Sequence, residues 1–102
     1  MLQENPSITD IFAANDNAAF GVMNAIRTLG KEIPQDLSVV GFDDIFYAQD
    51  MIPPLTTMAI DKIRMGENAV IQLEYRALNP SAHSMTQILD GKLITRSSVR
   101  SL

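Results

Sequence analysis

Cysteine is absent from this chain of 102 residues, which excludes disulfide bonds, thiolate metal sites and thiol catalysis. Histidine occurs once, as His83, and no aspartate or glutamate stands near it at the spacing that a zinc site needs. The sequence contains no G-x-S-x-G nucleophile motif, no P-loop and no G-x-G-x-x-G motif. Nothing in it therefore requires catalysis, and we expect neither an enzyme nor a cofactor or metal site.

Positive charge is also scarce. Lysine and arginine number 8 against 12 acidic residues, which gives a net charge of -4. The basic residues are scattered, and the closest group, Arg96 and Arg100, lies in a C-terminal tail that we expect to be solvated. Because contact with phosphates needs concentrated positive charge, we do not expect this chain to bind nucleic acid by itself.

Long hydrophobic runs are missing as well. No apolar stretch approaches the length of a membrane span. The first residues, Met1–Pro6, lack the basic region and apolar core of a signal peptide. We therefore expect a cytoplasmic protein without a membrane partner. With 46% hydrophobic residues, the chain suffices for one small globular unit.

The order of apolar runs and breaker residues predicts an α/β fold. Ile8–Ala14 is expected to form a short buried strand, followed by a helix over Asp16–Leu29 that ends at Gly30. Leu37–Phe42 is then expected to form a second strand. Since a helix joins the two strands, they should run parallel with a right-handed crossover.

The second half of the chain continues this alternation. A helical turn is expected at 45–50, a strand at 56–60 and a long helix at 61–78. The local pattern predicts a hairpin over 85–97, where Asp90-Gly91 separates two β-like runs. One apolar stripe of the long helix holds Ile63, Gly66, Val70, Leu73 and Ala77.

Apolar residues occupy two faces of the helix over 16–29. The face expected to pack on the sheet holds Ala18, Val22, Ala25, Ile26 and Leu29. Phe20 and Met23 fall on the far side, close to Asn24. Two explanations fit this pattern: a second buried face made by another subunit or by further chain, and ordinary scatter of exposed apolar residues.

Asp43 and Asp44 end the second strand, and Asn15 follows the first. Parallel strands place these ends on one edge of the sheet, where α/β proteins hold ligands. A magnesium or phosphorylation site would need further acids, and an acid–base pair is not favoured because adjacent residues point to opposite faces. A carboxylate can also bind the vicinal hydroxyls of a sugar. Alternatively, either acid caps a turn and Asn15 caps its helix.

Three motifs occur in a fixed order along the chain. IFAANDNAAFGVMNAIRTLGKEIPQDLSVVGFDDI comes first, followed by PPLTT and by LITRSSVR near the C-terminus. From about Ile8 to Arg100 the chain resembles the LacI/GalR family of bacterial transcriptional repressors, and within it the last part of the effector-binding core. The resemblance implies a partial periplasmic-binding-protein-like fold of type I, with a parallel sheet, flanking helices and an incomplete core of two subdomains.

The same resemblance implies a ligand site. One subdomain would comprise about 8–57 and 93–102, and the other about 61–84, with 85–97 crossing between them as a bent strand rather than a hairpin. A sugar or related small polar effector would bind between the subdomains. Its contacts would be Asn15 and Asp43 from one side, and Ile60, Lys62 and Met65 from the other.

The resemblance further implies a homodimer and a regulatory role. Its interface would include Phe20, Met23, Asn24 and Met51. Operator DNA would be bound only through a helix-turn-helix domain that these residues do not include. The ligand would shift the subdomain arrangement and so control DNA binding, while a sugar-binding transport receptor of the same fold is the alternative. A fragment of this kind is expected to expose apolar sheet edges.

Overall fold

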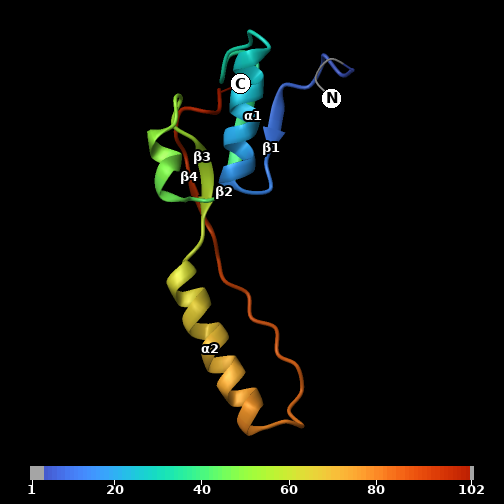
Figure 1. Cartoon of the computed structure of the whole chain (residues 1–102), viewed down its shortest axis with the longest axis vertical. Helices are drawn as coiled ribbons and strands as arrows, with labels where there is room; N and C mark the ends of the chain where they lie inside the picture. The colour runs from blue at the N-terminus through green and yellow to red at the C-terminus, as the bar shows by residue number, and fades with distance from the viewer. Residues whose placement is uncertain (1–3, 102) are drawn as a thin grey trace. The chain divides into compact units, whose positions relative to one another are not determined.

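The structure of the chain is a computed structural model that describes residues 4–101, and it contains two compact units (Figure 1). The first unit comprises the chain up to Ala59 and again from Lys92 onward, and the second comprises Ile60–Gly91. The chain therefore crosses between the units twice, after Ala59 and after Gly91.

A four-stranded sheet forms the centre of the first unit. Its strands are β1 (Asp10–Phe12), β2 (Ser38–Asp43), β3 (Thr56–Ala59) and β4 (Lys92–Ile94), and their order in the sheet is β1-β2-β3-β4. β1 and β2 are parallel, as are β2 and β3, whereas β4 is antiparallel to β3. The α/β class and the parallel pairing of the first two strands are therefore confirmed.

Helix α1 (Asp16–Thr28) joins β1 to β2, begins at the predicted residue and ends one residue before the predicted Leu29. Asn15 has an extended backbone, and its Oδ1 accepts a hydrogen bond from the amide of Ala18 at 2.8 Å. Gly30 has a φ of 72°, the left-handed conformation that commonly ends a helix. Amides of Gly30 and Lys31 donate to the carbonyls of Arg27 and Ile26, which satisfies the last turn.

The rotation of α1 about its own axis differs from the prediction. Its buried residues are Asp16, Ala19, Met23 and Ile26, and together with Leu37, Val39, Ala48 and Leu55 the apolar ones form the core. Leu29, expected to face the sheet, is exposed, and Met23, expected on the far side, is fully buried. The predicted dimer contact at Met23 is therefore wrong, because the side chain lies inside its own unit.

The reason is that two stripes of the helix carry similar amounts of apolar surface. Ile26 belongs to both stripes. The other buried apolar residues, Ala19 and Met23, each come one residue after a member of the predicted face, which is a rotation of roughly 100° about the helix axis. Asp16 decides between them, because it makes buried hydrogen bonds and so must face the sheet. A hydrophobic pattern alone does not contain that constraint.

The sheet has one covered face and one open face. Ile11 and Val39 pair in register on the side of α1, whereas Phe12 and Val40 pair on the opposite side. Phe12 is 68% exposed, although the sequence predicts a buried first strand. Leu93 of β4, level with Met58, is also exposed. Phe12 and Leu93 belong to the two edge strands, so apolar side chains are exposed at both edges of the sheet, as the sequence predicts.

Part of the C-terminal tail belongs to the fold, so the prediction that it is solvated holds for the exposed Arg100 but not for Ser98 or the half-buried Arg96. Ser98 is fully buried, its hydroxyl donates to the carbonyl of Val39 at 2.6 Å, and it accepts from the amide of Thr56 at 2.8 Å. The amide of Val39 donates to the carbonyl of Ser98 at 2.8 Å. The tail therefore fills the space between the start of β2 and the start of β3, where the two strands are not yet paired with each other.

The second unit contains α2 (Lys62–Leu78) and the segment that follows it. Asp61 caps the helix through the amide of Arg64 at 2.9 Å. None of its residues is buried, and its apolar stripe is exposed. The chain returns beside the helix, where Gln72 and Gln87 are hydrogen-bonded at 2.9 Å.

The hairpin predicted over 85–97 does not form. Residues 85–91 contain no strand, and Lys92–Ile94 pairs with β3 in the first unit instead. Lys92–Ile94 therefore makes its strand hydrogen bonds with β3, whereas the local pattern predicts them with the other β-like run of the same segment. The short helical turn expected at 45–50 is confirmed as the 3-10 helix η1 (Phe46–Asp50).

The two possible rotations of α1 lead to different mutational costs. We expect Met23→Ala to lower the free energy of unfolding by about 2–5 kcal/mol, because it leaves a cavity in the core. Leu29→Ala, at an exposed position, should lower it by roughly 0.5 kcal/mol or less. Urea unfolding of both variants measures the difference, and equal losses would contradict the observed packing.

Candidate functional site

Asn15 and Asp43 lie at the same edge of the sheet. Phe12 is level with Val40 in the parallel register. Asn15 comes three residues after Phe12, and Asp43 comes three residues after Val40. Asn15 is exposed, and its oxygen caps α1, which leaves its amide N–H groups as donors for a ligand. The edge therefore combines an amide donor with a carboxylate acceptor.

The backbone at the end of β2 has an unusual conformation. Asp43 has a φ of 111° and Asp44 a φ of 50°, and both values are rare for residues other than glycine. Such residues cost about 1–3 kcal/mol each and persist where the surroundings hold them. The half-buried Asp43 thus lies at the first of two strained positions.

A buried carboxylate holds the turn that follows Asp43. Asp16 is fully buried, and its Oδ2 accepts a hydrogen bond from the amide of Ile45 at 2.8 Å. Its Oδ1 accepts from the hydroxyl of Thr57 at 2.6 Å. The same hydroxyl oxygen accepts from the amide of Asp44 at 3.4 Å. We call Asp16 and Thr57, with these bonds, the turn clamp.

Gly41 provides the space that the clamp needs. A Cβ atom at this position of β2 would lie 2.2 Å from Oδ1 of Asp16 and 2.9 Å from Cδ2 of Leu55. Both distances are shorter than side chains tolerate, so the carboxylate reaches the sheet only over a glycine. A glycine inside an apolar strand is the one sequence signal that could have indicated this close approach.

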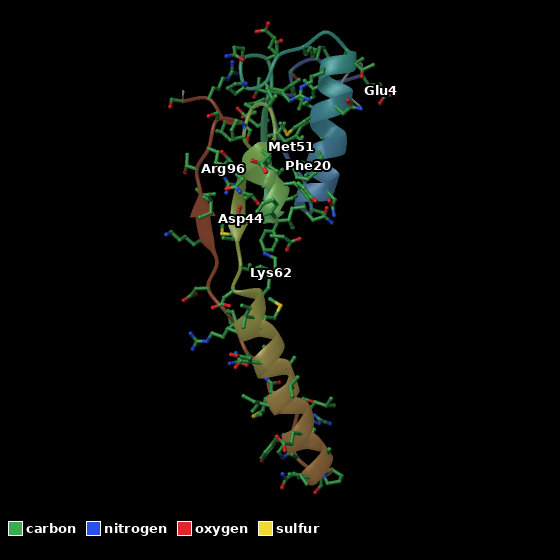
Figure 2. The ribbon with its side chains drawn as sticks, turned by 60° about the vertical axis from the view of Figure 1, so that its left-hand side comes forward. Glu4, Phe20, Asp44, Met51, Lys62 and Arg96 are labelled. Carbon is green, nitrogen blue, oxygen red and sulfur yellow. The ribbon has the colours of Figure 1, made fainter. Side chains whose placement is uncertain are left out.

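Asp44 forms a structural ion pair. Its Oδ1 accepts from a guanidinium nitrogen of Arg96 at 2.8 Å, and Figure 2 shows the two side chains in the first unit. The other terminal nitrogen of Arg96 donates to the carbonyl of Leu55 at 2.8 Å, and its amide donates to the hydroxyl of Thr56 at 2.9 Å. Arg96 thus ties the strained turn to the start of β3.

A small polar pocket lies beside this ion pair. It has a volume of about 190 Å³ and is lined by Asp44, Ile45, Phe46, Gln49 and Arg96. Phe46 and Tyr47 are both exposed, with their rings edge-to-face and the centroids 5.6 Å apart. These aromatic side chains therefore lie outside the core, on the same stretch of chain as the two aspartates.

The remaining predicted contacts belong to the second unit. Ile60 begins that unit, and Lys62 and Met65 lie in the first turn of α2, after its cap at Asp61. Lys62 and Met65 are exposed and Ile60 is half-buried. Their place in a site with Asn15 and Asp43 stays a prediction.

The sequence does not reveal the roles of Asp16, Thr57 and Arg96. Asp16 reads as an ordinary acid in the first turn of a helix, and Thr57 as one residue of a strand. Within residues 4–101, no group of three or more histidine, aspartate or glutamate side chains is arranged to hold a metal ion. Over the same residues, no helix is long and apolar enough to cross a membrane.

Comparison with known proteins gives concordant results. The family model described as periplasmic binding protein-like domain matches residues 2–99. The chain is 37% identical to the ribose operon repressor of Haemophilus influenzae, over 100% of this chain and 31% of that protein. A LacI family transcriptional regulator from Enterococcus faecalis, solved with bound ribose, is 34% identical with a TM-score of 0.85, over 98% of this chain and 38% of the other.

The lac repressor dimer bound to operator and the anti-inducer ONPF is similar as well. Its TM-score is 0.83 at 32% identity, over 98% of this chain and 35% of that chain. The chain thus spans about a third of the length of these relatives.

The close approach at Gly41 can be tested with a matched pair of variants. We expect Gly41→Ala to lower the free energy of unfolding by about 1–3 kcal/mol, because the new methyl group displaces Asp16 or Leu55. Gly21→Ala in α1, where a Cβ atom meets nothing within 4 Å, should raise it by roughly 0.5–1 kcal/mol. Chemical denaturation measures both, and a neutral Gly41→Ala would contradict the packing.

Proposed function

The chain belongs to the family of periplasmic binding protein-like domains, in the form that LacI-type regulators contain, and on that premise we propose that it senses an effector for a transcriptional repressor. The observation that carries this proposal is the edge of the sheet where Asn15 follows the end of β1 and Asp43 ends β2. Ligands of α/β sheets bind at such carboxyl ends. Two of the named relatives are repressors, which supports a non-enzymatic role at the level of the family.

The proposed effector is a sugar or a related small hydroxylated molecule. An ionised carboxylate such as Asp43 accepts hydrogen bonds from two vicinal hydroxyl groups, while the amide of Asn15 donates to a third oxygen. The regulator from Enterococcus faecalis was solved with bound ribose, which makes ribose the first ligand to test. Ile60, Lys62 and Met65 are proposed as the contacts from the second unit.

Regulation would follow from the two units. The chain passes between them twice, after Ala59 of β3 and before Lys92 of β4. These two residues are register partners in the sheet, so the two crossings begin side by side. A ligand that binds one arrangement of the units more tightly shifts the population toward it. We propose that this shift controls operator binding through a DNA-binding domain outside these residues, in the cytoplasm.

A sugar-binding transport receptor of the same fold is the alternative function. It would use the same ligand edge, but its ligand-induced change would act on transport rather than on DNA. The repressors among the relatives favour the first function.

A homodimer is proposed through α1 and the loop after η1. Phe20 and Asn24 are four residues apart on α1 and so share a face, and Phe20 and Met51 are both half-buried against the core of the first unit (Figure 2). Met23 is buried inside the unit and so is not part of the proposed interface. The lac repressor, to which the chain is similar, was solved as a dimer.

The ligand edge can be tested in a hybrid in which this chain replaces the matching segment of the Enterococcus faecalis regulator. We expect Asp43→Ala to weaken ribose binding by roughly ten- to a hundredfold, because a hydrogen bond to a charged group contributes about 1.5–3 kcal/mol. Isothermal titration with D-ribose, and with a panel of other sugars and nucleosides, measures the affinity.

Asp50→Ala is the matched control, because it removes an exposed acid near the same loop. It should leave ribose affinity within about twofold, as expected for a surface substitution. If Asp43→Ala binds ribose as tightly as the unchanged hybrid, Asp43 is not a ligand contact and the proposed site is wrong.

The dimer surface can be tested in the same hybrid. Asn24→Arg places a charge on the proposed interface, and we expect it to shift the protein from dimer to monomer. Ala25→Arg introduces the same charge at another exposed position of α1 and should leave the dimer intact. Sedimentation equilibrium distinguishes the two masses, and a dimeric Asn24→Arg hybrid would argue against this interface.

A further inference from the structure

The segment Asp43-Asp44-Ile45 is held in place by elements distant in sequence. Two successive non-glycine residues with positive φ form an arrangement that the local chain does not favour. The amides that follow Asp43 are bound from two sides, Asp44 by β3 and Ile45 by α1. The strained backbone therefore persists because the turn clamp of Asp16 and Thr57 holds both amides.

Asp16 does more than an acid in the first turn of a helix usually does. Such an acid stabilises the helix from an exposed position through the partial charge of the helix N-terminus. Asp16 instead is fully buried and uses both oxygens in bonds to groups outside its helix. Burying a carboxylate is costly unless hydrogen bonds satisfy it. The burial of Asp16 therefore depends on its bonds to Ile45 and Thr57.

The position of Asp16 also links the two proposed ligand contacts. Asn15 caps α1, and Asp16 is the first residue of the helix. One residue of this pair thus contributes to the ligand edge, while the next holds the backbone that presents Asp43. A displacement of Asp16 would alter the spacing between Asn15 and Asp43.

We propose that Asp16 is a positioning residue for ligand binding, which fixes the Asp43 carboxylate beside Asn15 through the turn clamp. The proposal rests on the proposed function, because it concerns the geometry of the same site. Thr57 is the second member of the clamp, since its hydroxyl donates to Asp16 and accepts from the amide of Asp44. Gly41 is its structural requirement, because any side chain there would collide with the carboxylate.

The first test measures amide hydrogen exchange by NMR in the full 102-residue chain. In Asp16→Ala, we expect the amides of Asp44 and Ile45 to exchange roughly ten- to a hundredfold faster, beyond any change common to the whole unit. Asp16→Asn retains one acceptor oxygen and should show an intermediate effect. If Asp16→Ala does not fold, Thr57→Val removes the hydroxyl with little change of shape and should expose the amide of Asp44.

Ser98→Ala is the matched control. Its hydroxyl is equally buried and also makes two hydrogen bonds, at 2.6 and 2.8 Å, but between the start of β2 and the start of β3. It should lower overall stability without selectively exposing the amides of Asp44 and Ile45. If Ser98→Ala and Asp16→Ala change those two amides equally, the clamp is only a general source of stability and the proposal is overturned.

The second test measures D-ribose affinity in the hybrid that carries the full chain. We expect Asp16→Ala to weaken binding by at least tenfold, Asp16→Asn by less, and Ser98→Ala by no more than about twofold. Unchanged affinity in Asp16→Ala, while Asp43→Ala weakens binding as expected, would overturn the positioning role and leave the proposed function intact. Unchanged affinity in Asp43→Ala would overturn the proposed function, and the exchange experiment would still decide whether Asp16 holds the turn.

Discussion

The hydrogen bonds of the buried Asp16 carboxylate are the interaction on which the first unit depends most. They join the start of α1 to β3 and to the backbone beyond β2, so one side chain connects three elements. Because both oxygens are used, the carboxylate is satisfied although it is fully buried. Its position over Gly41 also fixes how α1 lies on the sheet, and Met23 and Ile26 enter the core as a consequence.

A second set of polar contacts closes the unit from the other end of the chain. Ser98 connects β2 with β3, and Arg96 connects the Asp44 side chain with the residues at the start of β3. The contacts of Ser98 lie at the start of the segment Val39–Asp44, and those of Arg96 lie at its end. The short sheet is therefore held by side-chain hydrogen bonds as well as by its own ladder, and these bonds determine where the proposed ligand contacts are placed.

The open sheet face and α2 both expose apolar side chains. The chain spans about a third of the length of its relatives. Phe12 belongs to a strand that reads as buried, yet it is exposed because only one face of the sheet is packed by α1. A continuous apolar run therefore does not show by itself which faces of a strand are covered.

The local elements could be predicted from the residues alone. The cap at Asn15, the helix end at Gly30 and the parallel strands around α1 depend on neighbours within a few positions or on the period of apolar residues. The residues alone do not predict the rotation of α1, the burial of Met23 or the roles of Asp16 and Arg96. Asp16 binds Thr57 across 41 positions and Arg96 binds Asp44 across 52, so these partners become neighbours only when the strands assemble. The sequence and its family resemblance named Asp43 as the candidate contact, whereas the tertiary structure alone revealed what holds it, since hydrogen bonds between distant segments leave no periodic signal.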